Sequence, residues 1–74
     1  PFFCVINLTT THESQIRDPS AATQRLVAAL PAELRHDPAK AIVPPVYPDT
    51  PITRRDLANY ADNLTALDRQ VGEI

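Results

Sequence analysis

The sequence predicts a small α+β domain that is mostly helical. We expect an N-terminal strand, a kinked helix, a polyproline II segment and a C-terminal amphipathic helix on which that segment packs. Three observations support this fold class: an apolar, β-branched run opens the chain, two segments carry apolar residues at helical spacing, and a proline-rich run separates these segments. With 74 residues, the chain is expected to form one domain, 1–74.

The composition narrows the possible classes of function. A net charge of −2 lacks the basic excess of nucleic-acid-binding proteins. The single glycine, Gly72, excludes a glycine-rich phosphate loop. One cysteine and two histidines are too few for a disulfide or a structural metal site, and no apolar run is long enough for a membrane helix. We therefore expect no metal, cofactor, nucleic-acid or membrane partner, and a cytoplasmic protein.

The predicted strand covers residues 1–10, because FFCVINLTT at residues 2–10 is dense in aromatic and β-branched side chains. Both of its faces are largely apolar, so we expect both to be covered and Cys4 to be a core residue. A single strand cannot pair its own backbone groups. It is therefore expected to pair with a second strand in this chain or in another copy.

Residues 18–36 are predicted to be helical, after a polar loop at residues 11–17. Asp18-Pro19 is a favourable start, because aspartate can cap a helix and proline suits its first position. Apolar residues then recur every four positions at Ala22, Leu26, Leu30 and Leu34. Pro31 is expected to end or kink the helix near Leu30, since proline cannot donate the helical hydrogen bond.

The segment 42–49 contains Val-Pro-Pro-Val-Tyr-Pro, which favours polyproline II because each proline restricts its own backbone and that of the preceding residue. The final predicted helix spans residues 53–71. Thr53 gives a capping-box-like start, and Thr50 followed by Pro51 is the alternative start. Its apolar residues follow spacings of three and four, which is a heptad seam: Leu57, Tyr60, Leu64, Leu67, Val71 and Ile74. We expect Asp62 and Asp68 to lie on a solvated face opposite this seam.

Pro45-Val46-Tyr47-Pro48, together with Leu57, Tyr60 and Leu64 on the helix, carries a family resemblance. Residues 41–71 resemble the polyproline–helix hairpin of pancreatic polypeptide and neuropeptide Y. The resemblance implies that the polyproline II segment packs back along the helix through Ile42, Pro45 and Pro48. The basic, amidated tail with which that family binds its receptors has no counterpart here, so the resemblance implies a shape and not a receptor function.

Pro1 followed directly by an apolar run carries a second resemblance. This start is similar to the tautomerase superfamily, whose N-terminal amine acts as a general acid or base. The resemblance implies that Pro1 is catalytic on enol or 2-oxo acid substrates, and that Arg17 or Arg35 holds a substrate carboxylate. Pro44 and Pro45 oppose it, because they cannot donate the hydrogen bonds of a second strand.

The predicted function is non-enzymatic association, because a chain of this size buries too little surface to be stable without a staple or a partner. We expect a homo-oligomer or a subunit of a larger assembly. The predicted contact residues are Phe2, Phe3, Val5 and Ile6 on the strand, and Leu57, Tyr60, Leu64, Leu67 and Val71 on the last helix. The alternative is a homo-oligomeric tautomerase that uses Pro1 as general acid or base, which leaves open whether the protein is an enzyme.

Overall fold

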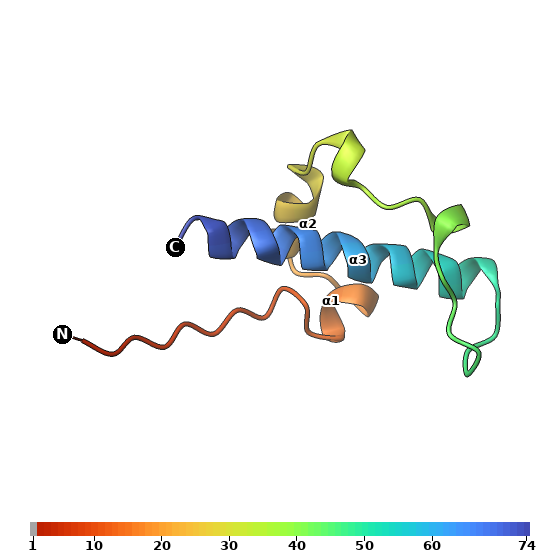
Figure 1. Cartoon of the computed structure of the whole chain (residues 1–74), viewed down its shortest axis with the longest axis horizontal. Coiled ribbons are helices and arrows are strands. Elements are labelled where there is room, and N and C mark those ends of the chain that lie inside the picture. The colour runs from red at the N-terminus through yellow and green to blue at the C-terminus, as the bar shows by residue number, and fades with distance from the viewer. Residues whose placement is uncertain (1) are drawn as a thin grey trace.

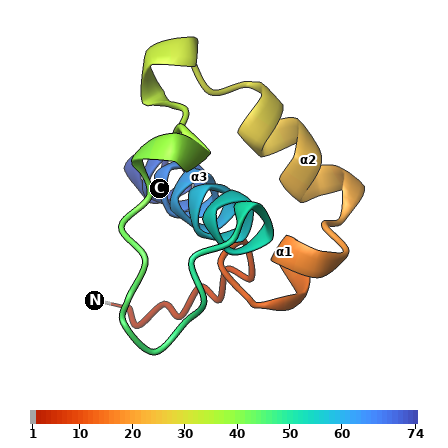
Figure 2. The same cartoon turned by 90° about the vertical axis from the view of Figure 1, so that its right-hand side faces the viewer.

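One long helix, α3, organises the computed structural model, which describes residues 2–74. This helix extends over Pro51–Gly72. The elements before it are short: helices α1 (Ser14–Arg17) and α2 (Ala21–Ala28), followed by the 3-10 turns η1 (Ala32–Leu34) and η2 (Pro38–Lys40). Helices α1 and α2 contact one side of α3, and η2 contacts another side (Figure 1 and Figure 2).

The predicted N-terminal strand is wrong, and with it the α+β class. The protein is about 55% helical, and none of residues 2–74 lies in a strand. Residues 2–8 instead run as an extended chain beyond the helices (Figure 1). A strand needs a neighbouring edge for its backbone groups, and the described part of the chain offers none, since residues 2–8 make no backbone hydrogen bond within it.

Helix α1 (Ser14–Arg17) is a single turn in the segment expected to be a loop. Helix α2 begins after Ser20 because the Ser20 side chain accepts a hydrogen bond from the Thr23 backbone N–H at 3.2 Å. The helix ends at Ala28, two residues before Leu30, and Pro31 occupies the N-cap position of the following 3-10 turn. The helical region therefore divides into short pieces joined by bends.

The predicted C-terminal helix is confirmed, and its first turn uses the alternative start. The Thr50 hydroxyl accepts a hydrogen bond from the Thr53 backbone N–H at 3.2 Å, which caps the helix. Pro51 occupies the first turn, where a missing N–H loses no helical hydrogen bond. The helix continues to Gly72 and, with 22 residues, is the longest element of the described chain.

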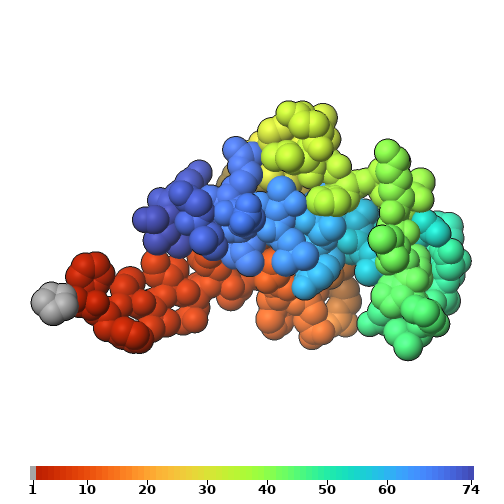
Figure 3. Space-filling model, in the orientation of Figure 1, coloured from red at the N-terminus to blue at the C-terminus, as the bar shows by residue number. Residues whose placement is uncertain are grey.

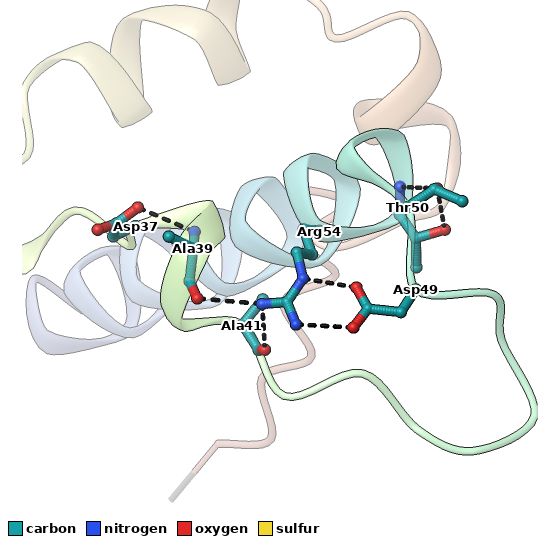
Figure 4. Close-up of polar contacts among 7 residues, drawn as sticks. Asp37, Ala39, Ala41, Asp49, Thr50 and Arg54 are labelled. Atoms are coloured by element: carbon teal, nitrogen blue, oxygen red, sulfur yellow. Dashed lines mark hydrogen bonds and ion pairs between the residues drawn. The ribbon is translucent and has the colours of Figure 1, made fainter.

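Arg54 ties the segment before α3 to the helix (Figure 4). Its Nε and Nη2 donate to the two carboxylate oxygens of Asp49 at 2.6 and 2.9 Å. Its Nη1 donates to the carbonyls of Ala39 at 3.0 Å and Ala41 at 3.2 Å. The hydrogen bond from Arg54 keeps the pKa of Asp49 below its usual value. One guanidinium thus closes the loop that leads into α3.

The proline-rich segment bends within this closed loop. The Tyr47 backbone N–H donates to the Pro44 carbonyl at 3.0 Å, so residues 44–47 form a turn. The side chains expected to pack on the helix are exposed, namely Ile42, Pro45 and Pro48. The contact with α3 comes instead from η2, which lies earlier in the chain.

The buried core of this structure is small. Its buried apolar residues, among those described, are Leu30, Ala58 and Ala66. The radius of gyration is 14.0 Å, whereas a compact chain of this length is expected to have about 11 Å. None of the described helices has the length and apolar character needed to cross a bilayer. Much apolar surface therefore stays in contact with solvent.

Candidate functional site

An apolar stripe along α3 remains open to solvent. We use this name for Leu57, Tyr60, Leu64, Leu67, Val71 and Ile74. Tyr60 and Leu64 are 41% and 44% exposed, and exposure rises to 55% at Val71. Because an α-helix has about 3.6 residues per turn, the spacings of three and four place the stripe residues from Leu57 to Val71 on one face, and Ile74 lies just beyond the end of the helix. Leu57 and Leu67 are half-buried, so the heptad pattern is present on the helix but most of it does not face the rest of the described chain.

The face of α3 that does pack inward carries small and polar residues. Ala58, Asp62, Asn63 and Ala66 are the buried residues of this helix. The prediction that Asp62 belongs to a solvated face is therefore wrong, whereas Asp68 is exposed as expected. Alanines at this face let the short elements α2 and η2 approach the helix closely. The helix thus buries a face of small and polar residues, while most of its large apolar side chains stay exposed.

A second exposed apolar region is the N-terminal segment 2–6, called here the apolar tail. Phe2 and Phe3 are 92% and 91% exposed, and Val5 and Ile6 are more than half exposed. Cys4 is exposed as well, so the expectation of a core cysteine is wrong. Figure 3 shows the described start of the chain, in red, projecting from the body of the molecule. These side chains make little contact with the rest of the described chain.

The base of the apolar tail is attached to the C-terminal part of α3. Thr10 is buried, and its hydroxyl donates a hydrogen bond to the side-chain carbonyl of Gln70. The chain turns just after this point, where the His12 backbone N–H donates to the Thr9 carbonyl at 2.9 Å. The tail and the C-terminal end of α3 consequently extend toward the same end of the molecule (Figure 1).

Asp62 is the centre of the polar contacts on the buried face of α3. Its side chain is 4% exposed. One carboxylate oxygen accepts from Arg35 Nε at 3.0 Å, and the other accepts from the His36 backbone N–H at 2.8 Å and lies 2.9 Å from His36 Nδ1. Because an ionised carboxylate can only accept hydrogen bonds, the Nδ1 atom of His36 must carry the proton of this contact.

The environment of Asp62 keeps its side chain ionised. Burial alone would raise the pKa of this carboxyl group. The hydrogen bonds from His36 and Arg35, together with the charge of Arg35, outweigh that effect and hold the pKa of Asp62 below its usual value. The ionised carboxylate therefore fastens residues 35–36 to α3.

Two surface hollows lie on either side of this cluster. One, of about 240 Å³, is lined by α1, α2 and the inner face of α3, and it includes Thr23 and Asn63. The Asn63 amide nitrogen is buried and has no hydrogen-bond partner. The other, of about 440 Å³, lies between residues 35–42 and α3. No group of three or more potential metal ligands occurs among residues 2–74.

The candidate catalytic residues are not assembled into one site. Pro1 lies outside the described residues. Arg17 is on α1 and makes an exposed pair with Glu13 at 3.6 Å. Arg35 follows η1 and is held by Asp62. The two arginines therefore have different partners on different elements, and nothing in the described chain directs Arg17 toward a pocket.

The contacts of Asp62 are the main polar feature that sequence reasoning missed. Its partners Arg35 and His36 lie 27 and 26 positions away along the chain. An aspartate at a polar position of an amphipathic helix gives no signal of such a contact. Only the placement of residues 35–36 against α3 makes it visible.

Comparison with known proteins gives one informative match. No family model and no solved structure matches the chain. Among curated proteins, the chain is similar to an ulvan-active sulfatase of Formosa agariphila, with 27% identity over 99 aligned residues. The match covers the whole chain and 17% of the sulfatase, so the chain spans about a sixth of that protein's length.

Proposed function

We propose that this chain is an association module that docks, through its apolar stripe and apolar tail, onto further polypeptide of a sulfatase-related protein. The observation that carries the proposal is the orientation of α3. This helix buries Asp62 and Asn63 while it exposes Tyr60, Leu64 and Val71. A helix in water is expected to have the opposite arrangement, so its apolar face is best explained by a partner that covers it.

The energetics support the same proposal. Burial of one large apolar side chain stabilises by about 1.5–3 kcal/mol, and the buried apolar core of the described chain consists of one leucine and two alanines. The exposed stripe and tail hold most of the remaining hydrophobic free energy. Exposed apolar patches of this kind are typical of interaction sites. Docking would thus supply stability that the fold does not obtain internally.

The sulfatase match supports a proposal for the nature of the partner. In that relative, the region similar to this chain is embedded in a polypeptide about six times as long. We therefore propose that the partner surface is supplied by the remaining part of such a protein, and that the assembled protein is a sulfatase. In this proposal the chain contributes a packing surface, and the reaction is carried out by the assembly.

Sedimentation velocity and a binding measurement test the proposal. The isolated chain, across a hundredfold range of concentration, should show a mass above 8.2 kDa because its apolar surface self-associates. It should also bind the Formosa sulfatase from which the matching region has been deleted, as measured by fluorescence anisotropy of the labelled chain. Val71→Ser should weaken either association about tenfold, since burial of one valine contributes about 1.5 kcal/mol.

Val46→Ser is the matched control, because Val46 is also an exposed valine but lies in the loop before α3. It should leave both associations unchanged. Self-association without binding to the truncated sulfatase would identify a second copy as the partner and contradict the sulfatase-related partner. A compact monomer that binds nothing, or equal effects of the two valine substitutions, would overturn the proposal.

A further inference from the structure

We propose that the cleft between residues 35–42 and α3 binds a small oxyanion that carries an apolar body, through the side chains of Arg35 and Lys40. The cleft has a volume of about 440 Å³, which is ample for a ligand of the size of a substituted benzene. Its polar lining comes from residues 35–40 and its apolar lining includes Ile42 and Leu57. Leu57 belongs to both this cleft and the apolar stripe, but the charged groups that would hold the anion lie on residues 35–40, outside the docking surface.

The charges of the cleft favour an anion. Arg35 is held by Asp62 through Nε alone, and its two terminal nitrogens have no partner among the described residues. Lys40 makes no ion pair with any described residue. The negative charge of Asp62 is buried and already shared by three hydrogen bonds. The free edge of a guanidinium matches an oxyanion with two parallel hydrogen bonds.

The cleft is also pre-organised. Asp62 fastens both Arg35 and the neighbouring His36 to α3, so the guanidinium is held at the cleft before any ligand arrives. Less side-chain entropy is then lost on binding. The 3-10 turn η2 holds the backbone of Lys40 beside the cleft. This turn is capped by the Asp37 carboxylate, which accepts a hydrogen bond from the Ala39 backbone N–H at 2.9 Å.

Asp37 is the one exposed negative group of the cleft lining. Its charge should oppose the binding of an anion, whereas the charge of Lys40 should favour it. Removal of its charge should strengthen anion binding, whereas removal of the Lys40 charge should weaken it. If anion binding depended only on the net charge of the protein, removal of the charge of any surface arginine would weaken it as much as removal of the Lys40 charge. Arg55 provides this control, because it lies on α3 outside the cleft and pairs with Asp56 at 3.4 Å.

The test is a titration followed by two-dimensional ¹H–¹⁵N NMR. Benzoate, phenyl phosphate and phenyl sulfate are the probes, and benzamide is the neutral control of the same shape. At least one anion should shift the amide signals of residues 35–42, and the anion that binds most tightly distinguishes a carboxylate from a phosphate or sulfate ester. Lys40→Gln should weaken binding about fivefold, as expected for a partly exposed ion pair.

Asp37→Asn should tighten binding by a similar factor, and Arg55→Gln should leave it unchanged. Arg35→Gln also removes a partner of buried Asp62, so Lys40→Gln decides the question if the Arg35 variant does not fold. Equal binding of benzamide, equal effects of Lys40→Gln and Arg55→Gln, or no shift of residues 35–42 with any anion would overturn the proposal.

Discussion

Replacement of Asp62 by asparagine measures how strongly one buried carboxylate holds the structure together. Asparagine keeps the shape of the side chain and one oxygen acceptor, which can still accept from the His36 backbone N–H. The amide group that replaces the other oxygen faces Arg35 Nε, now 3.0 Å from a carboxylate oxygen, as donor against donor. The substitution therefore removes one charge-assisted hydrogen bond and leaves the guanidinium without its partner.

The expected loss of stability in Asp62→Asn follows from the hydrogen bond that is removed. A hydrogen bond to a charged group contributes about 1.5–3 kcal/mol. The Arg35 side chain is 45% exposed, so water replaces part of what is lost. We expect the free energy of unfolding to fall by about 2 kcal/mol, near the lower part of that range. Urea denaturation followed by circular dichroism at 222 nm measures it.

The effect should also depend on pH. The pKa of Asp62 is lowered in the folded state, whereas an aspartate in an unfolded chain has a pKa of about 3.9. A carboxylate with a lowered pKa stabilises the fold fully above the unfolded pKa, and this contribution is lost as the pH falls through the folded value. The difference between the wild-type protein and Asp62→Asn should therefore be constant above about pH 5 and shrink below pH 4.

Asp68→Asn is the matched control, because it makes the same change of charge at an exposed position of the same helix. Its effect on the free energy of unfolding should stay within about 0.5 kcal/mol. Equal losses of stability for the two variants at pH 7, or a difference from wild type that does not change with pH, would refute the reasoning about buried Asp62.

Two further predictions concern the start of α3. Thr50→Ala removes the acceptor that caps the helix and should lower the free energy of unfolding by about 1 kcal/mol, as measured by urea denaturation; Thr50→Ser, which keeps the hydroxyl, should restore most of it. Arg54→Lys keeps the charge but cannot bond Asp49 and the carbonyls of the 39–49 segment together, so amide hydrogen exchange in residues 39–49 should become faster. Arg55→Lys, beside it, should leave exchange unchanged, and equal exchange in both variants would argue against the closing role of Arg54.

The sequence was informative about α3 and uninformative about which of its faces is buried. Regular spacing from Leu57 to Val71 identifies a helix because that period is a local property of the chain. The direction in which the helix faces depends on what packs against it. Here the packing elements are short, and their contacts favour Ala58 and Ala66, which permit close approach, over the larger residues of the stripe.

The N-terminal segment shows a related limit. Phenylalanine, valine and isoleucine at residues 2–6 favour extended backbone, and the backbone is extended. Pairing is a different property, because it requires an edge supplied from elsewhere. The contacts of Asp62 could not be predicted from the sequence either. Its partners lie more than 25 positions away, and no local pattern identifies a side chain that makes such a contact.

The closed loop before α3 has a consequence for how this protein can change. Arg54 fastens both ends of the segment, at Asp49 and at the Ala39 and Ala41 carbonyls, while Val46 at its tip stays 83% exposed. Residues inserted between the fastened ends would project into solvent, and doubling the length of such a loop costs only about 0.6 kcal/mol. The tip near Val46 is thus the place where this chain can gain length, accept a tag or be cut by a protease while α3 keeps its first turn.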